Sequence, residues 1–156
     1  MFQPREIVYG YAKGLYLSHN KYIVTIYQDD DLSIVACFTT SQQRAGVPEL
    51  QIQHGPIYRD KKCISYVFER GVAIGRNPDT GNEFSFPKRT VITFDYGVRE
   101  GQREYFMEQF DNPVVVCVLD EKEYMELVYA MYCSPYTKTS HKVVLDKILQ
   151  DYYSRQ

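Results

Sequence analysis

Six short apolar runs separated by turn residues constrain the fold of this chain more than any other feature of its sequence. Each run is rich in β-branched and aromatic residues, a composition typical of strands. The run at 34–38 is apolar throughout, which favours a strand covered on both faces. A proline that fixes φ and a glycine that accepts a positive φ predict a turn at 77–81. The predicted strands are residues 7–11, 22–27, 34–38, 63–68, 90–94 and 114–119.

Helical periodicity begins only after Gly97. A short helix is expected at 104–110, and two amphipathic helices should follow the last strand. Asp120 is the expected N-cap of the first amphipathic helix, and Ser140 that of the second. Apolar residues at helical spacing form a stripe on each, namely Tyr124, Leu127, Val128 and Met131, then Val144, Ile148, Leu149 and Tyr152.

The order of these elements predicts an α+β fold in a single domain covering residues 1–156. Residues 5–95 should form a small antiparallel, strongly curved sheet or an SH3-like barrel. Residues 96–156 should add the short helix, one strand and the two C-terminal helices. The segment at 43–59, with two glycines and two prolines, is expected to be a long loop. Loops of this length in compact domains are often functional.

Composition narrows the classes of function. A net charge of −2 argues against non-specific DNA binding. The four cysteines form no C-x-x-C pair, and the carboxylates at 29–31 lack the spacing of a calcium loop, so no metal and no cofactor is expected. Neither a leader-like segment nor a membrane-spanning run is present. A cytoplasmic location with reduced thiols and no membrane partner is the resulting expectation.

Two histidines and a group of hydroxyls are candidates for chemistry. His19 and His54 lie in predicted loops beside basic residues, where each is either a general acid or base or a solvated loop histidine. His141 is expected at the surface of the last helix. Thr39, Thr40 and Ser41 end a predicted buried strand. Their hydroxyls either converge on one anionic oxygen or satisfy their own backbone.

Basic residues gather in the middle third of the chain and could form a groove for RNA. Single-stranded RNA requires cations for its backbone and aromatic rings for its unstacked bases. The alternative is an ordinary charged surface. Similarly, the fifteen tyrosines, in a chain without tryptophan, either complete a small core or provide a stacking or subunit face. The candidate RNA-binding residues are Arg44, Tyr58, Arg59, Lys61, Lys62 and Arg76.

Three stretches give the chain a family resemblance. Residues 20–24, 36–42 and 87–92 follow one another in an order that resembles the bacterial toxins MazF, PemK and Kid, which are small SH3-like barrel ribonucleases. Together with residues 6–8 they span roughly residues 5 to 95. The family's second strand is usually preceded by Arg-Pro, whereas this chain has Asn20 and Lys21 there.

The resemblance implies cleavage of RNA without a metal, by attack of the ribose 2′-hydroxyl on the adjacent phosphorus. It makes Thr39 or Thr40 the match of the catalytic threonine, and Arg89 the match of an arginine that supports the fold. Lys21 occupies the position of the catalytic arginine. Lysine supplies charge but lacks the planar, bidentate fork of arginine, so either activity is lost or another residue such as His19 replaces it.

Three hypotheses follow from the sequence. The first is a toxin-like endoribonuclease acting on single-stranded RNA, with a small antitoxin protein as a further partner. The second is a non-catalytic module on the same barrel that binds protein or RNA. The third is a structural or regulatory homodimer with tyrosines and C-terminal helices at its interface.

Overall fold

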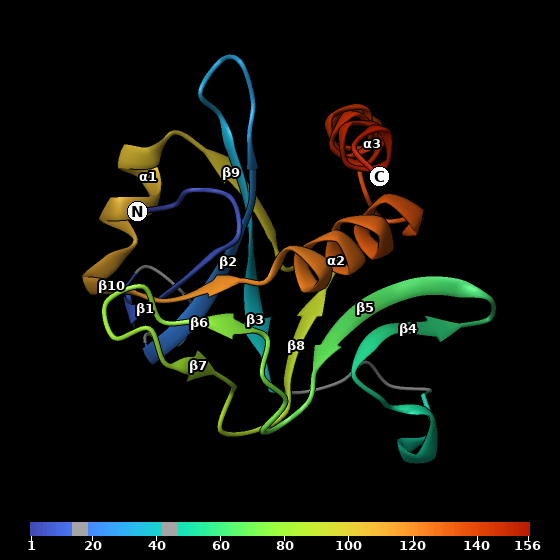
Figure 1. Cartoon of the computed structure of the whole chain (residues 1–156), viewed down its shortest axis with the longest axis horizontal. Coiled ribbons are helices and arrows are strands. Elements are labelled where there is room, and N and C mark those ends of the chain that lie inside the picture. Colours follow the sequence, from blue (N-terminus) through green and yellow to red (C-terminus); the bar gives the residue numbers. More distant parts are fainter. Residues whose placement is uncertain (14–18, 42–46) are drawn as a thin grey trace.

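The computed structural model describes residues 1–13, 19–41 and 47–156 and has an α+β fold (Figure 1). The strands are β1 (Glu6–Ala12), β2 (His19–Gln28), β3 (Ile34–Thr40), β4 (Gly55–Arg59), β5 (Lys62–Phe68), β6 (Gly75–Arg76), β7 (Glu83–Phe84), β8 (Thr90–Thr93), β9 (Val98–Gly101) and β10 (Phe110–Leu119). The helices are η1 (Glu49–Gln51), which is a short 3-10 turn, and α1 (Arg103–Glu108), α2 (Glu121–Cys133) and α3 (Thr139–Ser154).

The strands form one antiparallel sheet that curls into a half-barrel. Its order is β4-β5-β8-β3-β2-β1-β10-β6-β7, and β9 pairs separately with β3. The predicted fold class is therefore confirmed: a curved antiparallel sheet comes first, and helices follow at the C-terminal end (Figure 1). The sheet also extends beyond residue 95, because β9 and β10 belong to it.

Strand β3 changes partner along one of its edges. Residues Ile34 to Cys37 pair with β9, whereas Thr39 and Thr40 pair with β8. The other edge of β3 pairs with β2, with Ile23 opposite Phe38. Because β2 and β3 are antiparallel, the start of β2 lies beside the end of β3. The hydroxyl-rich exit of β3 therefore meets the residues that open β2.

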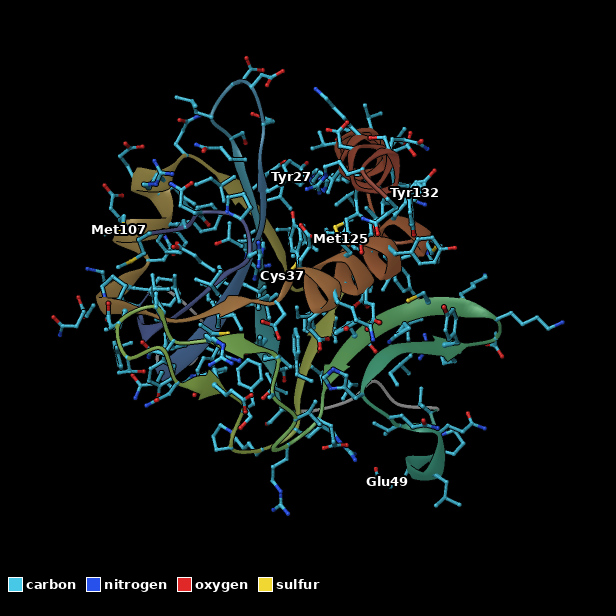
Figure 2. The ribbon with its side chains drawn as sticks, viewed as in Figure 1. Tyr27, Cys37, Glu49, Met107, Met125 and Tyr132 are labelled. Atoms are coloured by element: carbon cyan, nitrogen blue, oxygen red, sulfur yellow. The ribbon has the colours of Figure 1, made fainter. Side chains whose placement is uncertain are left out.

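Both faces of the central strands are buried, as the uninterrupted apolar run at 34–38 predicts. On one face, Cys37 lies in the main core cluster with α2 and α3, to which Met125 also belongs (Figure 2). On the other face, Ala36 and Phe38 pack with Phe106 of α1 in a second cluster. The thiol of Cys37 is fully buried, and burial raises its pKa to about 12. This cysteine therefore behaves as a small apolar residue, not as a nucleophile.

The expectation of a continuous loop at 43–59 is wrong, because β4 occupies its last five residues. Pro56 lies at the edge of the sheet, where a missing N–H breaks no ladder bond. Ile57 points into a small apolar cluster and Tyr58 points outward. Glycine and proline, which open β4, are typical of loops, and for this reason the sequence does not indicate this edge strand of the sheet.

The predicted apolar stripe of the last helix, α3, faces the core: Leu149 is buried, and Val144, Ile148 and Tyr152 are partly buried against the main core cluster. Lys138, and not Ser140, is its N-cap residue, and no side chain caps the helix. Its buried residues are His141, Leu145 and Leu149. His141 is therefore not a surface residue: its Nε2 lies 2.8 Å from Oε2 of Glu100. Asp120 does precede α2 as predicted, although its side chain makes no capping hydrogen bond.

None of the helices in the described ranges is both long enough and apolar enough to cross a bilayer. α3 packs on α2 and α1 on β10, and α2 itself packs on β4 and β5 of the sheet. Leu127 and Val128, which belong to its predicted stripe, are fully buried in the main core cluster. The predicted stripe of α2 is thus confirmed.

Replacing Leu127 by alanine should lower the free energy of unfolding by about 2–5 kcal/mol, because it opens a cavity under α2. Urea denaturation monitored by circular dichroism would measure the loss. The matched control is Leu50→Ala, since Leu50 is 95% exposed and its truncation should change stability by less than about 0.5 kcal/mol. Equal losses in the two variants would contradict this account of the core.

Candidate functional site

An open cleft of about 270 Å³ lies where β2 begins and β3 ends. The pairing described above brings its walls together: β2 supplies His19 to Tyr22, and β3 and its exit supply Thr39 to Ser41. Thr40 pairs with Val91 of β8, and this pairing brings the preceding segment, with Lys88, into the wall. Five of the six predicted catalytic residues thus line one cleft, namely His19, Lys21, Thr39, Thr40 and Ser41.

Lys21 is the cation at the centre of the cleft. Its Nζ donates a hydrogen bond of 2.9 Å to the backbone carbonyl of Thr39. An ammonium group has three donors, so two remain for a bound anion. The side chain is half-buried, and this desolvation lowers the pKa of Lys21. A partly desolvated cation attracts a phosphate more strongly than a fully hydrated one.

The three hydroxyl residues differ in what they can offer. Thr39 is 5% exposed and its Oγ1 donates to the carbonyl of Tyr22 at 3.3 Å. Its hydroxyl proton therefore holds β3 to β2 and does not point to an anion. Thr40 is half-buried and Ser41 is exposed, and both line the cleft. Ser41, which is exposed, is the better candidate for a donor to an oxyanion.

His19 is exposed at the first residue of β2, beside Lys21 in the lining. Tyr9 and Tyr22 line the same wall, and their ring centroids lie 4.4 Å apart. An imidazole at this position can exchange a proton with a ligand. The tyrosine pair adds an aromatic surface next to the cations. Sequence reasoning missed this pair, whose members lie on separate strands and are brought together only by the register of β1 with β2.

The structure does not bring His54 to the cleft. Its Nδ1 accepts a hydrogen bond from the backbone N–H of Glu69, and its Nε2 lies 2.9 Å from Oε2 of Glu123. Both ring nitrogens are therefore engaged, and none is left for a substrate. The hydrogen bond to Glu123 raises the pKa of His54, whereas the bond from Glu69 requires a neutral Nδ1.

Tyr66 completes this network. Its hydroxyl donates to Glu123 of α2, and burial, with this bond, raises the pKa of Tyr66. The network joins β5 to α2 and is a structural support. Arg89, which the family resemblance makes structural, has a comparable place: its guanidinium binds Glu69 and Glu49 at 2.8 and 2.7 Å.

The five described residues among those predicted to bind RNA do not line the cleft. Tyr58, Arg59, Lys61 and Lys62 lie on the hairpin of β4 and β5, and Arg59 Nη2 donates weakly to the hydroxyl of Tyr136 at 3.5 Å. Arg76 of β6 donates to the carbonyl of Gly81 at 2.9 Å. Arg44 lies outside the described residues. Lys88 is instead the second cation in the lining, and the sequence places it in a stretch that resembles the toxin family.

Neither carboxylates nor cysteines form a metal site in the part of the chain that the structure describes. No group of three His, Cys, Asp or Glu residues is arranged to hold an ion there. The carboxylate of Asp29 instead accepts hydrogen bonds from the backbone of Asp31 and Ser33, both at 2.9 Å. This acidic segment is a turn held by its own side chain.

Comparison with known family models, curated proteins and solved structures found no match to this chain. The cleft brings together half-buried and exposed cations, hydroxyls, an imidazole and aromatic rings.

Replacing Tyr66 by phenylalanine should lower the free energy of unfolding by about 1–3 kcal/mol, because the Oε2 atom of Glu123 loses one of its two partners and keeps only His54. Chemical denaturation would measure this loss. Tyr153→Phe is the matched control, since Tyr153 is 58% exposed, and its stability should stay within about 0.5 kcal/mol of the parent. If Tyr66→Phe were as stable as the parent, the network would not support the fold.

Proposed function

We propose that the cleft binds single-stranded RNA and cleaves it, without a metal ion, by attack of the ribose 2′-hydroxyl on the adjacent phosphorus. One observation carries the proposal: the described lining contains Lys21, Lys88, His19 and several hydroxyls, and no carboxylate. In a chain whose net charge is −2, such a lining favours an anionic ligand. Tyr9 and Tyr22 add the aromatic surface that unstacked bases prefer.

The side chains of the cleft suit the roles that this reaction requires. His19 takes the proton of the 2′-hydroxyl as the 2′-oxygen bonds to phosphorus. Lys21, Thr40 and Ser41 stabilise the charge on the phosphorane oxygens. The bond from phosphorus to the 5′-oxygen then breaks, and Lys21, whose pKa burial lowers, donates a proton to that oxygen. Solvent restores both groups, and the products carry a 2′,3′-cyclic phosphate and a 5′-hydroxyl.

A non-catalytic RNA-binding module is the second candidate, and two observations favour it. Lysine replaces the family's arginine at position 21, and the hydroxyl of Thr39 is bonded to Tyr22. Both changes would weaken catalysis more than binding, because cleavage requires donors aimed at the transition state. Binding that weakens with salt, without cleavage, would identify this alternative.

A homodimer with tyrosines and the C-terminal helices at its interface stays a prediction, and so does a small antitoxin protein as a partner. Light scattering over a range of protein concentrations tests the first, and co-purification with the product of a neighbouring gene tests the second.

Purified protein should cleave single-stranded RNA in the presence of EDTA, because the proposed reaction uses the substrate's own 2′-hydroxyl. Analysis of the products should find 2′,3′-cyclic phosphate and 5′-hydroxyl ends, and RNA with 2′-fluoro groups should remain intact. Products with any other ends, or no cleavage at all, would overturn the proposed reaction.

Lys21→Met should reduce the rate of cleavage by about 10²–10³-fold, a typical loss for removing one donor to a developing oxyanion. It should also reduce the salt dependence of RNA binding by about one unit of slope. Lys122→Met is the control, since Lys122 is exposed on α2 and does not line the cleft. Equal activity of the two variants would exclude Lys21 from the site.

A further inference from the structure

A second hollow, of about 180 Å³, adjoins the cleft and shares Lys21, Thr39 and Thr40 with it. The hollow lies where β3 passes from β9 to β8. β3, the end of β8, the turn that follows it and β9 supply its other walls, which consist of Phe38, Thr93, Tyr96, Gly97 and Arg99. No carboxylate is among the described residues that line it.

The hydroxyl of Thr93 is the unusual feature of this hollow. Thr93 is 1% exposed, and its Oγ1 has no hydrogen-bond partner among the described residues. A buried polar group without a partner costs free energy and requires an explanation. Thr93 lines the hollow, but its Oγ1 is itself shut off from solvent, so a ligand there supplies the missing bond only by displacing a neighbouring atom.

Gly97 allows the backbone to approach closely beside this hydroxyl. A Cβ atom at position 97 would lie 2.8 Å from the carbonyl oxygen of Thr93 and 3.5 Å from its Oγ1. The same glycine joins the two halves of the hollow, since its N–H donates to Thr93 and its carbonyl accepts from Phe38. Any side chain at position 97 would therefore crowd the hollow where Thr93 lines it.

The rim of the hollow carries two flat groups. Arg99 lies over the ring of Phe38, with its Cζ atom 5.5 Å from the ring centroid. Its Nη1 donates to the carbonyls of Tyr96 and Val98, at 2.7 and 3.0 Å, which fixes the guanidinium plane. Tyr96 is 52% exposed. Guanidinium planes and exposed tyrosine rings are surfaces on which unstacked RNA bases stack.

We propose that this hollow binds the base of the nucleotide next to the phosphodiester held in the cleft. The inference rests on the proposed RNA-binding function and extends it to a second subsite. A phosphate at Lys21 and Thr40 would place the adjoining base beside Tyr96 and Arg99, because both hollows share these two phosphate-binding residues. The Thr93 hydroxyl then bonds to a polar atom on the edge of that base.

The test uses a labelled pentauridine with 2′-fluoro groups, which lacks the attacking hydroxyl, and five versions that each carry one abasic position. Fluorescence anisotropy measures the affinity of each for the full chain. One abasic position should weaken binding to the parent protein roughly tenfold, the effect of losing one stacked base. In Tyr96→Ala and in Thr93→Val, the intact oligonucleotide should already bind more weakly, and that abasic position should add little further loss.

Thr25→Val is the matched control. Thr25 is also buried with an unpartnered hydroxyl, and it does not line either hollow. Both threonine-to-valine variants should keep or raise the thermal midpoint without RNA, because an isosteric apolar group replaces an unpaired hydroxyl. Of these two threonine variants, only Thr93→Val should change how much affinity each abasic position removes.

Two results would overturn the subsite, and they are distinguishable. Salt-dependent binding with equal abasic losses in the parent, Tyr96→Ala and Thr93→Val would remove the base subsite and leave RNA binding in place. Absence of binding to any pentanucleotide by the parent protein would remove both the subsite and the proposed function.

Discussion

The change of partner along β3 is the constraint on which the rest of the site depends. One edge of this strand is paired with β2, while the other passes from β9 to β8 at Phe38. Every buried backbone donor and acceptor needs a partner, and the bonds through Gly97 provide them at the crossing. Strands that diverge at one point leave space between them. The adjoining hollow occupies that space, and the cleft lies next to it, where β2 begins and β3 ends.

Several acidic residues pair with cations away from the cleft and the hollow, and this placement favours an anionic ligand at the site. Glu49 and Glu69 are bound by Arg89. Glu100 is paired with His141 and Lys138, and the bond to His141 lowers the pKa of Glu100. These pairs leave the described walls of the two hollows without a carboxylate. A chain with a slightly negative net charge thus presents a locally positive concavity.

The sequence was sufficient to predict the elements whose buried apolar residues recur at a regular spacing. The strands at 22–27 and 34–38 and the stripe of α2 were predictable, because period and composition both point to a covered face. The cluster of Lys21 with the hydroxyls at 39–41 was also predictable from the pairing of adjacent strands. In contrast, β4 and the buried His141 were missed. An edge strand buries few of its side chains, so its apolar periodicity is weak. The residues near His141 in the sequence do not indicate its bond to Glu100, which lies far away in the chain.

Long-range pairing also explains why the remaining parts of the site escape sequence reasoning. His54 is a structural residue and not a catalytic one because its ring bonds to Glu123, which lies 69 residues away in the chain. The hollow at Thr93 could be predicted only if the register of three strands were known in advance. Basic residues near one another in the sequence, such as those of the hairpin of β4 and β5, separate from the cleft once the sheet forms.

The position of β10 has a consequence for biosynthesis. This strand inserts between β1 and β6, and Arg5 donates to the carbonyl of Leu119, which lies 114 residues later in the chain. Until the ribosome has released that distant segment, β1 retains an unpaired edge, the kind of edge that invites association between nascent chains. The late closure of the sheet also makes folding slow relative to proteins with local contacts. The hairpin of β1 and β2 is therefore the segment most open to such association during translation.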